Sequence, residues 1–480
     1  MKNKKATAII MTAMLTMLTA CGTTSSVTTN LTEEAGARSK NTSGAKASTV
    51  EQVSDKASEK SGESASKKNT SEKNGASYVS ISELNTEDMF SERDMEQSPD
   101  LTGTEKIKVS DNKNVTIDSA GTYVISGQSK ETTIYIEAGD EDKIQLVLDN
   151  VSITNNDTPV IYVKSADKVF ITTTDSKNSL AVTGEFKSDG DTNTDAVIFS
   201  KDDLVLNGTG TLTVASTDNA VASKDTLKIT GGNISIDCTG NAFEAHDAIE
   251  IADGNVDIIS CNDGLHAKDS DDNTKGYVYI GGGTFNITAA DDAIHATTFV
   301  RIDNGNLTMN CAEGIEGTVI HVNNGTINIT ASDDGINAAR KSSVSTPLFE
   351  MNGGEITINM GAGDTDGVDS NGDITINGGT LSITGRSTFD CDGKATYNGG
   401  TIIENGKETN TITNQMMGGM GNRGKMGNKN GMNNGNIMEK NNEMNGNSNI
   451  NNSGNFNGRG KMKGRGRGEI QNKDESMNNE

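Results

Sequence analysis

A short acidic phrase recurs through the second half of the chain, and this repeat limits the possible folds more than any other feature. Its clearest copies occupy residues 262–267, 291–296, 312–317 and 333–338. Each copy follows a glycine that opens a run of alternating polar and apolar residues: Gly210, Gly232, Gly254, Gly283, Gly305, Gly325 and Gly354. These glycines are mostly 20–22 residues apart, and twice 29 (254 to 283 and 325 to 354). A fixed period in this range is typical of stacked-repeat proteins.

The residue pattern inside one repeat predicts the type of solenoid. Apolar residues alternate, as in Gly283–Ile287, and no part of the repeat has helical spacing. A second strand is expected after each acidic phrase, for example at residues 298–302, and the phrase itself reads as a very short third strand. Three strands and three turns then form one coil. We predict an all-β parallel β-helix, with equivalent residues of neighbouring coils about 4.8 Å apart.

Composition agrees with this architecture and argues against one class of partner. The chain has 480 residues, of which 32 % are hydrophobic and 54 are Gly, and it has no Trp. A thin core with several turns per coil tolerates such a composition. The formal net charge of −25 makes a nucleic-acid partner unfavourable and suits either cation binding or a soluble, self-repelling surface.

The two ends of the chain have a different character. Residues 1–21 resemble a bacterial lipoprotein signal peptide, with a basic start, a short apolar run and a lipobox ending in Cys21, the expected lipidation site. Ordinary secretion with an incidental cysteine is the alternative. Residues 22–80 read as a disordered tether, residues 81–410 as the β-helix, and residues 411–480 as a disordered tail rich in Gly, Asn and Met. Ile81, Leu84 and Phe90 are expected in a short segment, with a helix as one option, that covers the first coil.

Stacking the repeats aligns oxygen-bearing residues in two columns. The first is predicted to contain Asn241, Asp263, Asp292, Glu313, Asp334 and Asp366, and the second Glu244, His266, His295, Glu316, Asn337 and Asp369. Both are expected to face outward, on a strand parity opposite to the inward isoleucines. Carboxylates about 4.8 Å apart repel by about 3–4 kcal/mol at an effective dielectric of 20, so we expect cations between the coils.

Hard oxygen ligands in flexible sites favour Ca²⁺ over Mg²⁺. The alternatives are a solvated acidic ladder, or carboxylates that cap backbone amides. The predicted calcium ligands on the columns are Asp263, Asp292, Glu313, Asp334, Asp366 and Asp369.

Further acidic loops could add cation sites. Asp189, Asp191, Asn193 and Asp195 carry oxygens at alternate positions, and Asp271 lies in one of two long insertions. The insertions after Ala267 and Ala338 are expected to leave the coil at the same edge and to wall one side of the acidic face. The remaining cysteines of the repeat (Cys238, Cys261 and Cys311) fit small buried positions and are predicted to be free thiols.

The acidic phrases, the glycine-led strands, the lipobox and the tail that begins at Asn414–Met420 together resemble a family of bacterial carbohydrate-binding domain proteins. The resemblance covers about residues 80–420. It implies a right-handed parallel β-helix with bound calcium, displayed on the outer face of the cell membrane. It also implies an acidic plant polysaccharide as ligand, such as polygalacturonate, with cellulose as a further expectation, and a fold similar to that of pectate lyases.

An acidic protein can bind an acidic sugar only through bridging cations or basic residues. Calcium on the Asp263, Asp292 and Asp334 column could do the first. The candidate carbohydrate-binding residues are His266, His295, Glu316, Asn337, Lys224, Lys268 and Arg340. A calcium-dependent lyase with Lys268 or Arg340 as base is the rival hypothesis. A hydrolase and a structural surface protein are weaker alternatives. Even spreading of the acids suits a linear ligand along the surface and favours a non-catalytic binding protein. We also expect a monomer.

Overall fold

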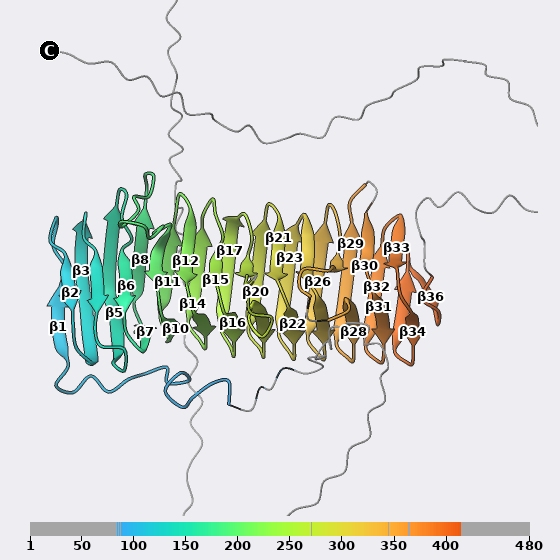
Figure 1. Cartoon of the computed structure of the whole chain (residues 1–480), viewed down its shortest axis with the longest axis horizontal. Coiled ribbons are helices and arrows are strands. Elements are labelled where there is room, and N and C mark those ends of the chain that lie inside the picture. The colour runs from blue at the N-terminus through green and yellow to red at the C-terminus, as the bar shows by residue number, and fades with distance from the viewer. Residues whose placement is uncertain are drawn as a thin grey trace, which may run out of the picture. The chain divides into compact units, whose positions relative to one another are not determined.

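A computed structural model describes Leu84, Thr86 and residues 88–413, apart from residues 270, 344, 363 and 364. The predicted lipidation site Cys21, the predicted tether and the predicted tail from residue 414 onward lie outside the described residues. Within those residues every regular element is a β-strand, and no helix is long and apolar enough to cross a membrane. The predicted all-β parallel β-helix is confirmed (Figure 1).

Each coil contributes one strand to each of three faces, which we number in chain order. Face 1 is a twelve-stranded parallel sheet that contains the acidic phrases. Its strands are β2 (Val115–Ile117), β4 (Ile134–Glu137), β6 (Ile161–Ser165), β9 (Ala196–Ser200), β12 (Asn219–Ser223), β15 (Phe243–Ala245), β18 (Leu265–Ala267), β21 (Asp292–Ala296), β24 (Glu313–Gly317), β27 (Ile336–Ala338), β30 (Asp366–Ser370) and β33 (Ser387–Cys391).

Faces 2 and 3 follow in each coil and are also parallel. Face 2 is built from β7 (Lys168–Thr173), β10 (Asp203–Gly208), β13 (Thr226–Ile229), β16 (Ala248–Ile251), β19 (Tyr277–Ile280), β22 (Phe299–Ile302), β25 (Val319–Val322), β28 (Leu348–Met351), β31 (Asp373–Ile376) and β34 (Ala395–Tyr397). Face 3 is built from β8 (Lys177–Val182), β11 (Thr211–Ala215), β14 (Asn233–Asp237), β17 (Asn255–Cys261), β20 (Thr284–Ala289), β23 (Asn306–Cys311), β26 (Thr326–Ala331), β29 (Glu355–Met360), β32 (Thr380–Thr384) and β35 (Thr401–Glu404).

The first and last coils depart from this scheme. The long strands β3 (Gly121–Lys130) and β5 (Lys143–Asn155) bend from one face to the next, and β5 pairs with both β7 and β8. Strand β1 (Glu105–Lys108) pairs with β3 at the start of the stack. At the other end, β36 (Lys407–Thr409) turns back antiparallel on β35 and occupies an edge that would otherwise continue the sheet.

The core is a continuous column of side chains inside the three faces. Isoleucine, valine and leucine alternate with outward polar residues, and phenylalanines such as Phe243, Phe285 and Phe349 are fully buried. The turn before each face 3 strand needs a positive φ, which Gly232 (92°) and Gly325 (111°) supply at low cost.

A corner between faces 3 and 1 explains why the acidic phrase contains Gly or Ala at a fixed place. A Cβ on Gly264 would lie 2.5 Å from the Ala293 carbonyl oxygen and 2.8 Å from Ile287 Cγ2, so this position points into the core. The next residue, Leu265, is also fully buried. Two successive inward residues break the alternation. The predicted shared parity is therefore wrong, and the corner instead brings residues three apart, such as Asp263 and His266, to the same outer side.

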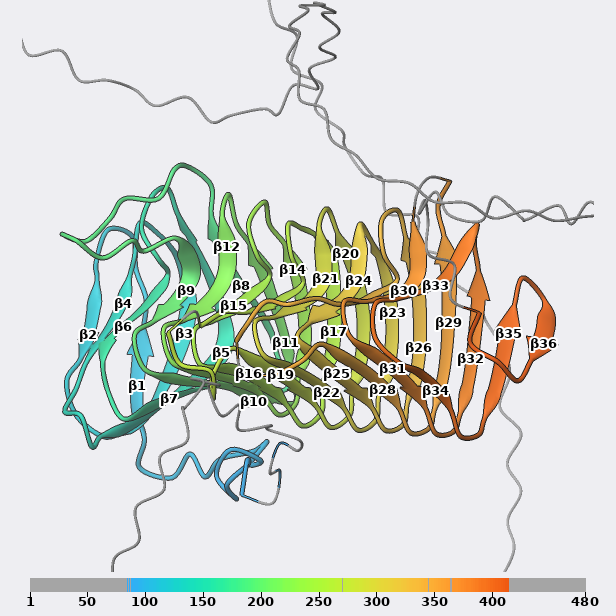
Figure 2. The same cartoon turned by 45° about the vertical axis from the view of Figure 1, so that its right-hand side comes forward.

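The segment that precedes the first strand lies along the outside of face 2. The Arg301 guanidinium of β22 donates a hydrogen bond to the Leu84 carbonyl oxygen (2.9 Å), and the Phe90 and Tyr279 rings are 6.2 Å apart. Figures 1 and 2 show this segment, in blue, running beside the middle coils. The prediction that this segment covers the first coil is therefore wrong. It packs on face 2 instead, where Tyr279 and Arg301 provide contacts for it.

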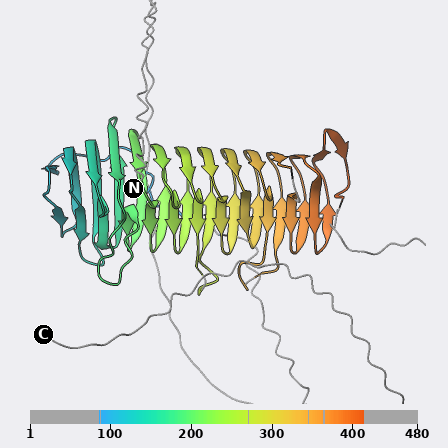
Figure 3. The same ribbon diagram turned by 90° about the horizontal axis from the view of Figure 1, so that it is seen from above.

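Both long insertions leave the stack at the corner between faces 1 and 2, as predicted (Figure 3). They comprise residues 268–276 and 339–347, and Asn273 Nδ2 lies 3.4 Å from Ser343 Oγ across them. Together with Tyr277 and Phe299 they line a small pocket. This pocket lies over face 2, so the insertions do not simply wall the acidic face.

The corner geometry predicts the effect of one added methyl group. Gly264→Ala should lower the free energy of unfolding by about 1–3 kcal/mol, because the new Cβ overlaps the neighbouring coil. The measurement is urea unfolding followed by circular dichroism in metal-free buffer. Asn286→Ala, an exposed change on the next coil, is the control and should shift stability by less than about 0.5 kcal/mol. Equal stability of both variants would contradict the corner assignment.

Candidate functional site

Face 1 carries the two predicted columns in register. We call the residues at the corner the corner column; backbone hydrogen bonds between successive coils align Asn241, Asp263, Asp292, Glu313, Asp334 and Asp366. We call those on the strands the strand column; direct pairing aligns Glu244, His266, His295, Glu316, Asn337, Asp369 and Asp390. The predicted stacking is confirmed, and Asp390 extends it by one coil.

One oxygen of several corner residues caps the backbone of the next coil. Asp263 Oδ1 accepts a hydrogen bond from the Asp292 amide (3.1 Å), and Asp334 Oδ1 accepts one from the Asp366 amide (3.0 Å). The alternative of amide capping therefore accounts for half of each of these carboxylates. The second oxygen is left for another partner.

In the middle coils that partner is a histidine. His266 Nδ1 lies 2.5 Å from Asp263 Oδ2, and His295 Nδ1 lies 2.6 Å from Asp292 Oδ2 and 2.9 Å from Glu316 Oε2. The two imidazoles stack at 4.6 Å with planes 5° apart.

Lys341 adds a second positive charge at the same place. Its Nζ, from the second insertion, is 2.5 Å from Glu316 Oε1. The middle of face 1 is therefore neutralised by residues of the chain itself, and its carboxylates are already engaged.

These contacts hold His295 in its charged form. Burial alone would lower the pKa of His295, but its hydrogen bonds to Asp292 and Glu316 outweigh burial and raise the pKa to about 9. For Glu316, burial is outweighed by the hydrogen bonds from His295 and Lys341, so its pKa is lowered. An imidazolium between two carboxylates is a donor and has no lone pair for a proton or a metal ion.

The C-terminal coils of face 1 lack such compensation. Burial, supplemented by neighbouring carboxylates, raises the pKa of Asp334 to about 6 and that of Asp369 to about 7. Burial likewise raises the pKa of Glu313 to about 7, although Asn337 donates to it. Within the described residues, the buried Oδ1 atoms of Asn337 and Asp390 have no hydrogen-bond partner. This region offers only oxygen ligands and excess negative charge, the ligand type that Ca²⁺ takes, but no three of its carboxylate oxygens lie within 4.8 Å of one another among the described residues.

The N-terminal coils replace the charges with aromatic rings. Tyr135, Tyr162 and Phe199 occupy the strand column there, with ring centroids 5.8 and 5.6 Å apart. Lys164 covers the two tyrosines, and Lys224 lies 5.5 Å from the Phe199 ring centroid.

The predicted calcium loop lies beside these rings. Asp189 Oδ2 accepts a hydrogen bond from the Tyr162 hydroxyl (3.2 Å), while Asp191 is exposed. Asn193 donates to Asp195 Oδ2 (2.5 Å), and Asp195 Oδ1 is buried without a partner among the described residues. No three carboxylate oxygens from Asp189, Asp191 and Asp195 lie within 4.8 Å of one another. Calcium binding by this loop stays a prediction.

Three further residues that were predicted to bind calcium or carbohydrate lie in the two insertions. Asp271, Lys268 and Arg340 are exposed. Lys224 pairs with Glu244 (3.4 Å). Sequence reasoning proposed Arg340 and missed its neighbour Lys341. The repeat period does not extend into the insertion, so it cannot show which of two adjacent basic residues reaches the columns.

Comparison with known proteins identifies the family. A model described as carbohydrate-binding domain-containing protein matches residues 111–367 and 315–409, together more than half of the chain. The chain belongs to this family. The match covers the whole of face 1 from β4 onward, and so includes both columns.

Two relatives show how far the likeness extends. A carbohydrate-binding domain-containing protein of Acetivibrio thermocellus is 39 % identical over 127 residues, which are 26 % of this chain and 44 % of that protein. This chain therefore spans less than half of that relative. A solved structure of a polysaccharide lyase-like protein from C. thermocellum, a gadolinium derivative, is 33 % identical. It covers 46 % of this chain and 96 % of its own, with a TM-score of 0.44.

The His295 contacts predict a pH dependence in this carbohydrate-binding domain protein. A pKa raised above the unfolded value of about 6.5 adds stability below pH 6.5 that is lost as the pH rises through about 9. In metal-free buffer the wild type should lose up to about 3 kcal/mol of this contribution by pH 9.5. His295→Gln should be less stable at pH 6 and should lack this loss. Thermal melts from pH 6 to 9.5 test it, and parallel curves for the two proteins would refute a charged His295.

Proposed function

We propose that this chain is a non-catalytic binding protein that holds an acidic polysaccharide, such as the polygalacturonate of plant cell walls, along face 1 through calcium ions. Membership of the carbohydrate-binding domain family supports a polysaccharide ligand. The observation that carries the proposal is the group of uncompensated carboxylates toward the C-terminal coils: Glu313, Asp334 and Asp369 all have raised pKa values, chiefly because they are buried. Glu313 and Asp334 lie on adjacent coils of the corner column, and Asp369 lies one coil further on, in the strand column.

Calcium would be held by the oxygen-only part of face 1. Asp334, Asp369 and Asp390 offer carboxylates, and Asn337 offers an amide oxygen without a hydrogen-bond partner among the described residues. Ca²⁺ takes six to eight oxygen ligands, more than this surface supplies in one place. Carboxylates of the bound sugar would complete the shell, which couples ion binding to ligand binding.

The middle coils would act differently. His295 and Lys341 bring positive charge to an otherwise acidic face, and their partners are the carboxylates already described. Half-buried imidazoles stacked at 4.6 Å present a flat surface, against which a sugar ring can pack. We assign this region to positioning the polymer rather than to holding calcium.

A lyase is the second candidate, and the geometry favours it less. Elimination needs a base beside a calcium-bound uronate. The two predicted bases, Lys268 and Arg340, are exposed. His295 is held protonated and cannot accept a proton.

The expected cell-surface location extends the proposal. The lipobox ending at Cys21 would anchor the protein on the outer face of the bacterial membrane. Residues 22–80 would let it reach a cell-wall polymer. Cellulose as a second ligand and a monomeric state belong to the same proposal.

Removing the excess charge predicts opposite effects with and without calcium. Asp334→Asn with Asp369→Asn should raise the melting temperature of the metal-free protein at pH 7.5, because buried repulsion disappears. The double variant should lose the rise that calcium gives the wild type, and should bind polygalacturonate at least tenfold more weakly. Calorimetry and affinity electrophoresis measure these effects. Asp333→Asn removes an exposed neighbouring charge and should behave as wild type. Unchanged sugar affinity after chelation of calcium would overturn the bridging role.

Absence of catalysis is tested separately. Incubation with polygalacturonate and calcium should give no increase in the ultraviolet absorbance of unsaturated uronate ends. A sustained increase that disappears in Lys268→Ala or Arg340→Ala would instead establish the lyase.

A further inference from the structure

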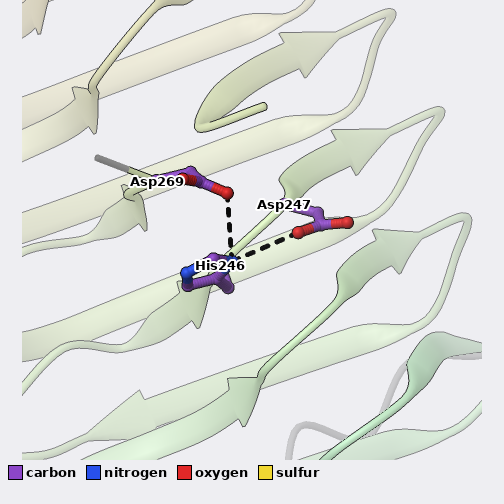
Figure 4. A group of neighbouring side chains, drawn as sticks. All are labelled: His246, Asp247 and Asp269. Carbon is purple, nitrogen blue, oxygen red and sulfur yellow. Dashed lines mark hydrogen bonds and ion pairs between the residues drawn. The ribbon is translucent and has the colours of Figure 1, made fainter. Parts of the chain in front are cut away.

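A histidine and two aspartates converge at the corner between faces 1 and 2, away from both columns. His246 and Asp247 join β15 to β16, and Asp269 follows β18 on the next coil. His246 Nδ1 lies 3.2 Å from Asp247 Oδ1 and 3.3 Å from Asp269 Oδ2 (Figure 4). One potential ligand atom of each residue therefore lies within 4.8 Å of the other two.

Asp269 is built into this position by the first insertion. Its side chain is only 3 % exposed, and its Oδ1 accepts hydrogen bonds from the amides of Asp271 (2.7 Å) and Asp272 (2.9 Å). Its Oδ2 receives no hydrogen bond within the described residues; its one polar neighbour there is His246 Nδ1. Because Oδ1 is held by two backbone amides and Oδ2 has only an imidazole beside it, Oδ2 is available to a further ligand.

Asp247 is oriented in the same manner. Its Oδ2 pairs with Lys275 Nζ (2.5 Å) at the end of the insertion, which leaves Oδ1 toward His246. Asp225 on the preceding coil also hydrogen-bonds to Asp247, and burial together with this contact raises the pKa of Asp225 to about 6. Each carboxylate thus uses one oxygen for a supporting contact and offers the other, which is how metal ligands are commonly held.

The distances separate this group from the other histidine pairs. His266 and His295 approach their aspartates to 2.5 and 2.6 Å, as charge-assisted hydrogen bonds do. The 3.2 and 3.3 Å separations around His246 are longer than such bonds. These two edges, which meet at His246 Nδ1, match the edge of about 3.3 Å of a tetrahedron whose metal–ligand bonds are about 2.0–2.1 Å, the values for zinc with nitrogen and oxygen. The third edge, between the two carboxylate oxygens, is no longer than 4.8 Å.

We propose that His246 Nδ1, Asp247 Oδ1 and Asp269 Oδ2 bind one divalent transition metal ion of the zinc class. An imidazole ligand selects such ions over Ca²⁺. Three carboxylates (Asp225, Asp247 and Asp269) against one lysine leave negative charge for the ion to neutralise. The His246 side chain is 48 % exposed, so a fourth position faces solvent. The ion fastens the first insertion to the preceding coil.

The test uses the metal-free full chain and zinc alone. Isothermal titration should give one zinc equivalent that is lost, or at least tenfold weaker, in both His246→Ala and Asp269→Asn. Asp269→Asn keeps an oxygen for the two backbone amides, so the loop can still fold. Asp271→Asn, an exposed residue of the same loop, is the matched control and should bind zinc as the wild type does. Cobalt in place of zinc should give the absorption bands of a tetrahedral site.

A second readout follows the loop itself. Trypsin can cut after Lys268 and Lys275, at either end of the insertion, and zinc should slow these cuts at least tenfold in wild type and Asp271→Asn only. Zinc uptake that persists unchanged in His246→Ala and Asp269→Asn would overturn the proposal. Displacement of zinc by equimolar calcium would overturn it equally. The outcome is independent of polysaccharide binding, because no sugar is present.

Discussion

Parallel stacking in register is the constraint on which every other feature depends. Each face repeats along the stack at about one strand spacing, so any residue chosen at one position meets its counterpart above and below. For apolar residues this gives a continuous core. For polar residues it forces a choice between groups that satisfy one another and groups that repel.

This chain has polar columns of both kinds, one with groups that satisfy one another and one with groups that repel, and they lie at different corners. Between faces 2 and 3, Asn323, Asn352, Asn377 and Asn398 form a ladder in which each amide donates to that of the preceding coil at 2.7–2.8 Å. An amide both donates and accepts, so such a ladder is self-sufficient. The corner column of face 1 uses Asp and Glu at the same spacing, and these only accept. A purely structural column would be expected to use asparagine there too, so the carboxylates favour an external partner.

Much of this could be predicted from the sequence, because registry follows from counting. The glycine period gave the coil and both columns, since each column lies at a constant distance from the repeat glycine. The predicted alternation of inward and outward side chains was wrong at the corner, where Gly264 and Leu265 both point inward. Only the contact of Gly264 with the neighbouring coil shows this. The segment at Leu84 was misplaced because apolar residues show that a surface is covered, but not which one. The group at His246 was missed because Asp269 reaches it from an insertion, where the period is lost.

The direction of the stack gives face 1 two unlike ends. The aromatic end is closed, because Phe199 and Tyr162 are buried and Lys164 and Lys224 lie across their rings. A linear ligand on face 1 is thereby confined to the coils from β15 onward, where the strand column is charged. Along these coils it meets first histidines that are already paired and then carboxylates that are not. Under the proposed function, calcium would therefore fix the polymer at the C-terminal end, while the stacked histidines fix its direction along the stack.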